Sequence, residues 1–205
     1  MNNSTWMAAA FLGLMIAGVG AADLQAQTPI QVVAGPVFAT LYGEDVDDDI
    51  GTKTGFFAGV GTTRELNEQF SISPYLILVQ KGAESSDGES QLSMNYLEVP
   101  ILLQTGIPIG EDGMGLGLSA GPAFGYQLSC DIDDNDCEGD GTFDKSFEVG
   151  FAVGASLGIP AGENGQFSVG GGVDLGLTSL HSDGDESAKN RGFYLFVGYG
   201  TAVGG

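Results

Sequence analysis

Basic residues are scarce in this sequence of 205 residues, which has 6 Lys and Arg against 27 Asp and Glu and a formal net charge of −21. A nucleic-acid-binding protein needs basic side chains to neutralise phosphates, so this class is excluded. Histidine occurs once, at His181, which leaves too few ligands for a zinc site with the two cysteines. The 35 glycines follow no collagen period, and a hydrophobic content of 42% argues against disorder.

Charged side chains are also absent from residues 1–22, where an apolar segment runs from Met7 to Ala22. The segment is shorter than the roughly 18 residues of a membrane-spanning helix, and small residues follow it. We therefore predict a signal peptide over residues 1–26, cleaved after Ala21, Ala22 or Ala26, with an N-terminal membrane anchor as the alternative. Residues 27–205 then form one domain, in which no segment is long and apolar enough for a membrane helix without glycine or polar interruptions.

The rest of the chain alternates with a period of two. From Met114 to Leu128 the even positions are apolar, whereas the odd positions hold mainly glycine, serine and alanine. Only a strand separates two such sets onto opposite faces. The same pattern is clear in three further segments (147–159, 167–177 and 193–199) and weaker in four others (30–42, 55–64, 70–80 and 92–107). The sequence thus predicts eight strands and no helix after the signal peptide.

The connections between these strands alternate in length. Long ones cover 43–53, 82–91, 130–145 and 181–191, and short ones cover 65–69, 108–113 and 160–165. Outer-membrane barrels have this asymmetry, with short periplasmic turns and longer external loops. A soluble sandwich or lipocalin-like barrel would bury its bulky side chains, whereas here small residues suit the narrow interior of an eight-stranded barrel. We therefore predict an all-β fold, an eight-stranded antiparallel up-and-down transmembrane β-barrel.

The acidic residues fit this topology. Most of them fall in the four long connections, and others fall in the short turns. Three remain within strands, Glu98, Glu148 and Asp174, and the alternation places them on the inward, small-residue face. The membrane-facing belt is thus uncharged and the external surface acidic. Because salt screens self-repulsion, this charge also suggests a salt-rich habitat.

Eight segments in order resemble the PorT-like family of outer-membrane β-barrel proteins of Gram-negative bacteria. The most specific is NYLEVPILLQ at 95–104, since the family repeatedly shows a Tyr-Leu-Glu-Ile/Val-Pro segment in its fourth strand. The others are AGPVFATL at 34–41, TGFFAGV at 54–60, FSISPYLILVQKGA at 70–83, AGPAFGYQLS at 120–129, FEVGFAVGASL at 147–157, DLGLTSL at 174–180 and KNRGFYLFVGYG at 189–200. The resemblance covers essentially the whole mature chain.

The resemblance implies outer-membrane localisation, contact with outer-membrane lipid and the barrel-assembly machinery, and partners among envelope or secretion proteins. Two positions depart from the family pattern. Gly172 stands where members commonly carry a basic residue, so an inward salt bridge to Glu98 lacks its usual partner. The usual terminal aromatic is replaced by Gly-Thr-Ala-Val-Gly-Gly at 200–205.

Clustered carboxylates in the segment 130–141 suggest a weak cation site at Asp131, Asp133, Asn135 and Asp136, because these oxygens are calcium ligands. The segment fails as an EF-hand loop, since its sixth position is Asp136 and its twelfth is Thr142. The alternative is an acidic solvated loop. In an exported protein Cys130 and Cys137 are expected to form a disulfide.

Two further groups of residues carry candidate chemistry. Ser179, His181, Ser182 and Asp183 could act in lipid modification, although three adjacent loop residues seldom align as a triad. Glu98, Glu148 and Asp174 could form an inward proton or ion site, the alternative being hydrogen bonding in a wet interior. Arg64 and Lys81 are expected to anchor strand ends at the membrane interface.

The expected function is a non-enzymatic outer-membrane barrel, without cofactor, that has a structural, binding or envelope-accessory role. The alternatives are a narrow small-solute channel, which the strand count disfavours, and a lipid-modifying enzyme.

Overall fold

The structure, a computed structural model, describes residues 29–44, 46, 50–88, 90–110, 112–133, 135–137, 146–180 and 188–202. The predicted signal peptide lies outside the described residues. Eight long strands make up the fold: β1 (Pro29–Tyr42), β3 (Lys53–Thr62), β5 (Phe70–Ser85), β6 (Gln91–Ile109), β7 (Met114–Ile132), β9 (Phe147–Ala161), β10 (Gly165–Gly176) and β11 (Lys189–Ala202). Three two-residue strands accompany them: β2 (Ile50–Gly51), β4 (Arg64–Glu65) and β8 (Asn135–Asp136).

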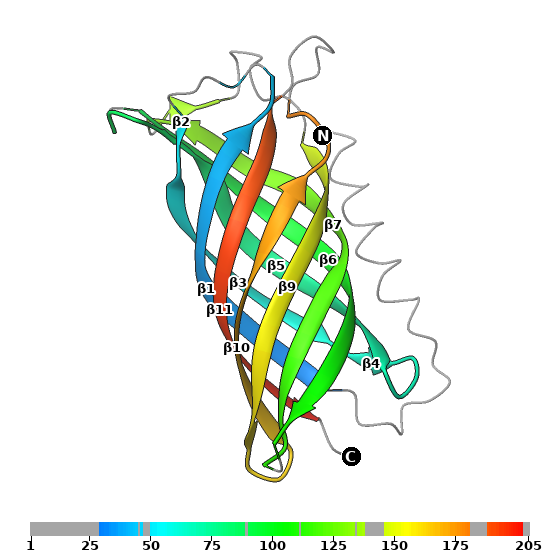
Figure 1. Cartoon of the computed structure of the whole chain (residues 1–205). Helices are drawn as coiled ribbons and strands as arrows, with labels where there is room; N and C mark the ends of the chain where they lie inside the picture. The colour runs from blue at the N-terminus through cyan, green and yellow to red at the C-terminus, as the bar shows by residue number, and fades with distance from the viewer. Residues whose placement is uncertain are drawn as a thin grey trace, which may run out of the picture.

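The eight long strands form a closed antiparallel ring (Figure 1). Each pairs with the next long strand along the chain, and β1 pairs with β11, for example at Val37 and Tyr194, so that the ring closes. Closure leaves no long sheet edge unpaired. The prediction of an eight-stranded up-and-down barrel is confirmed. Among the described residues, no helix is long and apolar enough to cross a membrane.

The connections β1–β3, β5–β6, β7–β9 and β10–β11 lie at one end of the barrel, called the loop end below, and β3–β5, β6–β7 and β9–β10 lie at the other, called the turn end. Only residues 86–90 separate β5 from β6, so this connection, which was expected to be long, is as short as those of the turn end. Several strands run further toward the loop end than the alternation predicted. β5 continues to Ser85 because Glu84 still pairs with Gln91, and β7 continues to Ile132, which pairs with Leu92. Strand pairing, which depends on the partner chain segment, therefore decides where these strands end.

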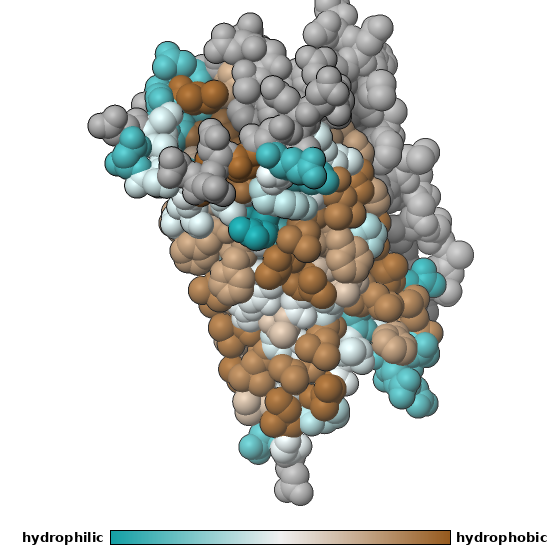
Figure 2. Space-filling view, turned by 45° about the horizontal axis from the view of Figure 1, so that its top comes forward, coloured by the Kyte–Doolittle hydropathy of each residue, from teal (hydrophilic) through white to brown (hydrophobic). Residues whose placement is uncertain are grey.

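The outside of the barrel is apolar, as predicted. Large hydrophobic side chains are exposed on every long strand, among them Phe56 at 70% and Val197 at 65%. Figure 2 shows hydrophobic residues covering most of the visible wall, with hydrophilic residues gathered toward its two ends. A surface of this kind is stable in a bilayer and would aggregate in water.

The inside differs in part from the expected ring of small residues. β7, β9 and β10 do point glycine, serine and alanine inward, but the opposite wall contributes large rings, including Phe57, Tyr75, Tyr96, Tyr194 and Phe196. Because the interior of the barrel has a fixed width, the wall with small side chains faces a wall with large ones. A Cβ atom at Gly170 would lie 2.6 Å from Cζ of Phe196, so this glycine makes room for the ring.

Candidate functional site

A buried ion cluster crosses the middle of the barrel. Lys81 of β5 lies at its centre and is fully buried, with its Nζ atom 2.5 Å from Oε1 of Glu98 on β6. The same ammonium is 2.6 Å from Oδ2 of Asp174 on β10 and 3.4 Å from Oε1 of Glu148 on β9. The three carboxylates are exposed by 3 to 5%. The ion cluster, defined as Lys81, Glu98, Glu148 and Asp174, thus ties together strands from opposite walls.

Neutral polar groups extend the ion cluster. Asn190 of β11, fully buried, donates from Nδ2 to Oε2 of Glu148 at 2.5 Å and to the hydroxyl of Tyr96 at 3.2 Å. The ring of Tyr96 also lies 5.6 Å from the Lys81 ammonium, a cation–π distance. Because a buried charge is stable only when it is paired and hydrogen-bonded, this network is what permits four charges inside the barrel.

The position of Lys81 corrects the expectation that it anchors a strand end. β5 continues past it to Ser85, and the alternation along that strand turns its side chain inward. Lys81 also supplies the salt bridge to Glu98 that Gly172 cannot make. The alternation did contain this signal, because Ser71, Ser73, Tyr75, Ile77, Val79 and Lys81 occupy the same parity.

The loop end of the interior is packed. Above the ion cluster lie apolar side chains of β1, β5 and β6, including Val37, Met94 and Ala83, all exposed by 4% or less. Connecting segments add to this packing, through Leu180 and through the disulfide between Cys130 and Cys137, whose Cα atoms are 5.3 Å apart. The predicted disulfide is present. Lys53 is also buried here and contacts Ser93 with its ammonium, a role that the sequence did not indicate.

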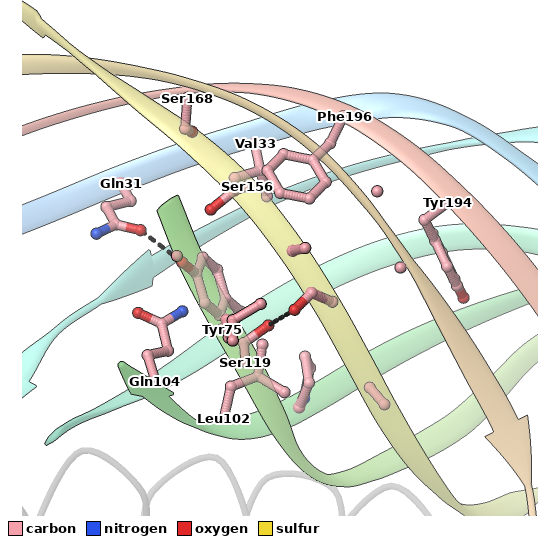
Figure 3. A pocket seen from close by; sticks show the side chains of 18 of the residues that line it. Gln31, Val33, Tyr75, Leu102, Gln104, Ser119, Ser156, Ser168, Tyr194 and Phe196 are labelled. Atoms are coloured by element: carbon pink, nitrogen blue, oxygen red, sulfur yellow. Dashed lines mark hydrogen bonds between the residues drawn. The ribbon is translucent and has the colours of Figure 1, made fainter. Parts of the chain in front are cut away.

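The turn end of the interior holds a cavity of about 370 Å³ instead (Figure 3). Neutral polar side chains surround it. Three of them belong to a hydrogen-bonded chain that passes through Thr63 and Ser73 behind the lining: Tyr75 donates to Gln31 at 2.5 Å, Gln31 to Thr63 at 3.0 Å, Thr63 to Ser73 at 2.8 Å and Ser73 to Gln104 at 3.0 Å. Glycines and serines of β7, β9 and β10 form the facing wall. Glu98 and Asp174 border the cavity, so it ends at the ion cluster.

The structure places the predicted cation ligands of the third long connection around the pairing of β7 with β8, where Asp131 is opposite Asp136 and Ile132 is opposite Asn135. Asp133 accepts hydrogen bonds from the Gln91 amide at 2.7 Å and from the Ser90 hydroxyl at 2.8 Å. Asn135 donates to the Asp133 carbonyl at 3.0 Å, Asp131 lies on β7, and the side chain of Asp136 is outside the described residues. Within the described residues, the acidic groups with closely spaced oxygens are Glu98, Glu148 and Asp174, all within 4.8 Å. The cation site at 131–136 stays a prediction.

The remaining candidates are only partly described. Ser179 lies beyond β10, whereas His181, Ser182 and Asp183 lie outside the described residues. Arg64 is exposed in β4 near the turn end, where an interfacial anchor would lie. Asn190 and Tyr96 complete the ion cluster without any motif that marks them, because their roles depend on which strands face each other across the barrel.

Comparison with known proteins supports the architecture. The chain is similar to the structure of Neisserial surface protein A, with 12% identity, a TM-score of 0.57, and coverage of 84% of this chain and 96% of that one. A further similar structure is OprG of Pseudomonas aeruginosa, with 11% identity, a TM-score of 0.44, and coverage of 88% of this chain and 98% of that one. Another is Ail of Yersinia pestis, with 16% identity, a TM-score of 0.43, and coverage of 85% of this chain and 99% of that one. At such identities the first likeness shows the fold alone.

No curated protein matches this sequence. A family model does match: the one described as outer membrane protein beta-barrel domain covers residues 17–182, which is most of the chain. The matched residues include seven of the eight long strands and all four members of the ion cluster, whereas β11, which carries Asn190, lies beyond the match. The chain therefore belongs to the outer membrane protein beta-barrel domain family and is a protein of the bacterial outer membrane.

Proposed function

We propose that this outer-membrane barrel is non-enzymatic and non-conducting, and that it acts by binding or by a structural, envelope-accessory role through its acidic loop end. The observation that carries the proposal is the ion cluster, which fills the middle of the barrel with the fully buried Lys81. Packed apolar side chains lie above it, so the cavity at the turn end does not continue to the loop end. An eight-stranded barrel has little room for a channel beside such a plug.

Conductance measurements test the proposal directly. The purified barrel would be inserted into planar lipid bilayers, with a porin in the same membranes as a positive control. We expect no stable single-channel steps, because ions would have to displace the buried charges of the ion cluster. Reproducible steps of constant size would overturn the non-conducting assignment and favour the narrow-channel alternative.

The proposal also includes membership of the PorT-like family and partners in the cell envelope. The eight segments described above support a PorT-like member, and the acidic loops offer a surface for basic partners in the envelope. Cross-linking in intact envelopes would identify neighbours. We expect envelope or secretion proteins and the barrel-assembly machinery among the products, whereas recovery of lipid alone would argue for a purely structural role.

The high acidic content further supports a salt-rich habitat, since the self-repulsion of a protein with a net charge of −21 is smallest where salt screens it. Unfolding of the purified barrel with and without salt tests this point. A midpoint that does not change with salt would contradict it.

A further inference from the structure

The lining of the cavity at the turn end changes in chemical character from its opening to its inner end. Its lining begins near the ends of the strands, at Gln31, Gly158 and Gly200, and extends inward to Glu98 and Asp174. Figure 3 shows Gln31, Gln104, Ser156 and Ser168 around one part of it, and Tyr194 and Phe196, which both belong to β11. A volume of about 370 Å³ falls in the range of small-molecule sites. The cavity is therefore open to the short-turn side and acidic at its inner end.

The inner end holds more acidic than basic groups. The ion cluster combines three carboxylates with one ammonium, Lys81. No lysine or arginine lines the cavity among the residues that the structure describes, and its other polar groups are neutral. A narrow space with low-dielectric walls concentrates the field of such a site. Cations are therefore attracted into the cavity and anions are repelled.

Two hydrogen-bond acceptors at the inner end lack partners. Oδ1 of Asp174, a residue only 4% exposed, and the hydroxyl of Tyr194 have no hydrogen bond to any described residue. Both residues border the cavity. Both oxygens are covered by protein atoms, so a ligand in the cavity reaches them only after these side chains turn, and donating to them then satisfies two acceptors that are otherwise unpaired. A primary ammonium group provides three such donors.

Lys81 shows that the carboxylates suit an ammonium. Its Nζ atom forms ion pairs with Glu98 and Asp174, at 2.5 and 2.6 Å. Because this ammonium occupies the space between the carboxylates, a metal ion has no vacant position there. The walls next to it are aromatic: Phe57 and Tyr194 pack edge to face, with ring centroids 5.2 Å apart, and Phe196 lies nearby in the same lining. Aromatic faces attract ammonium cations.

We propose that the turn-end cavity binds a small primary ammonium compound that enters from the periplasmic side. Its ammonium group lies at the inner end of the cavity beside Glu98 and Asp174, and its organic body lies against Phe57 and Phe196. Its far end contacts the amides and hydroxyls near the opening, such as Gln31, Gln104 and Ser168. The site is separate from the acidic loops, and it does not require that the barrel be non-conducting.

The test uses the full-length mature barrel in lipid nanodiscs and amide NMR. The probe is 4-amino-1-butanol, compared with the neutral 1,5-pentanediol and the anionic 4-hydroxybutyrate. We expect the ammonium probe to shift the amides of lining residues such as Gly154, Ser156 and Gly172 in a saturable way. The neutral and anionic compounds should leave these amides unchanged at the same concentration.

Two variants address the two halves of the proposal. Asp174→Asn removes one carboxylate while Glu98 and Glu148 remain to pair with Lys81, and it should weaken binding of the ammonium probe about tenfold or more. Ser156→Leu fills the cavity without changing any charge and should abolish binding. The matched control is Glu84→Gln, which removes a carboxylate from the loop end of β5 and should leave the affinity as in the wild type. Gel mobility of unheated samples verifies that each variant is folded.

Several results would overturn the proposal. One is an equal response to the ammonium compound and the diol, which would indicate a neutral cavity. Another is wild-type affinity in Asp174→Asn, and a third is a set of shifts confined to residues outside the cavity. Displacement of the probe by low concentrations of calcium would reassign the site to a metal ion. The conductance experiment above reads a different property, so the two proposals can fail independently.

Discussion

The two halves of the barrel interior differ in how they fill the same width. On the loop side of the ion cluster, Met94, Val37 and Ala39 are each fully buried and the space is packed with apolar groups. On the turn side, glycines and serines of β7, β9 and β10 face Tyr75 and Gln104, and a cavity remains. The strands continue from one half to the other, so the backbone does not cause the difference. Side-chain volume alone decides whether a narrow barrel is plugged or hollow.

This comparison depends on the ion cluster as the boundary between the halves. Lys81→Met should have the largest effect of any single change, because it leaves three buried carboxylates without a cation. Removing one partner from a buried ion pair destabilises a protein by about 3–5 kcal/mol. Urea unfolding in lipid vesicles, followed by the gel shift of folded barrels, measures this loss.

The matched control is Arg64→Met, which removes an exposed cation from β4 and should leave the unfolding midpoint nearly unchanged. In the double variant Lys81→Met with Glu98→Gln, part of the stability should return, since one uncompensated charge is removed. If Lys81→Met unfolds like the wild type, the ion cluster is not the boundary that the comparison requires.

Large-to-small substitutions should separate the halves next. Met94→Ala, at a fully buried position of the loop side, should cost about 2–5 kcal/mol, because the packed surroundings leave a new void. Leu102→Ala should cost less than half as much, because Leu102 already lines the turn-end cavity and fewer contacts are lost. Denaturant midpoints of the two variants, measured side by side, check the difference. Equal losses would mean that the cavity closes in the membrane.

Small-to-large substitutions should separate the two halves in the same order, with a smaller difference in stability. Ala83→Leu on the loop side, where the alanine is 4% exposed, forces extra atoms into a packed region and should cost about 1–3 kcal/mol. Ser156→Leu places a similar side chain in the cavity and should change stability by about 1 kcal/mol or less, since the space exists. Equal destabilisation by both substitutions would contradict a hollow turn end. The same unfolding assay measures both.

The period-two pattern was sufficient to predict the barrel, its strand count and the inward direction of Glu98, Glu148 and Asp174. These features depend on local alternation, which a strand converts directly into two faces. The role of Lys81 was mispredicted because strand length was judged from alternation alone, while Glu84 and Gln91 extend the pairing beyond it. Residues such as Asn190 could not be assigned at all. Their function depends on which side chains meet across the barrel, and that depends on closure and stagger.

The smallest effect is expected at the loop end itself, outside the packed interior. Asp133 is exposed and holds the Gln91 amide and the Ser90 hydroxyl through its two carboxylate oxygens. Asp133→Ala should therefore leave the global unfolding midpoint unchanged, while the Gln91 amide exchanges about tenfold faster, as expected for the loss of one hydrogen bond to a charged acceptor.

Hydrogen exchange with and without calcium extends this measurement to the predicted cation site. If Asp133 is a ligand, calcium competes for the oxygen that accepts from Gln91, and the exchange of this amide changes in the wild type but not in Asp133→Ala. If Asp133 only joins β7 to the connection before β6, calcium has no effect on either protein. The packed half of the interior should be insensitive in both cases, because its stability does not depend on the loop contacts beyond it.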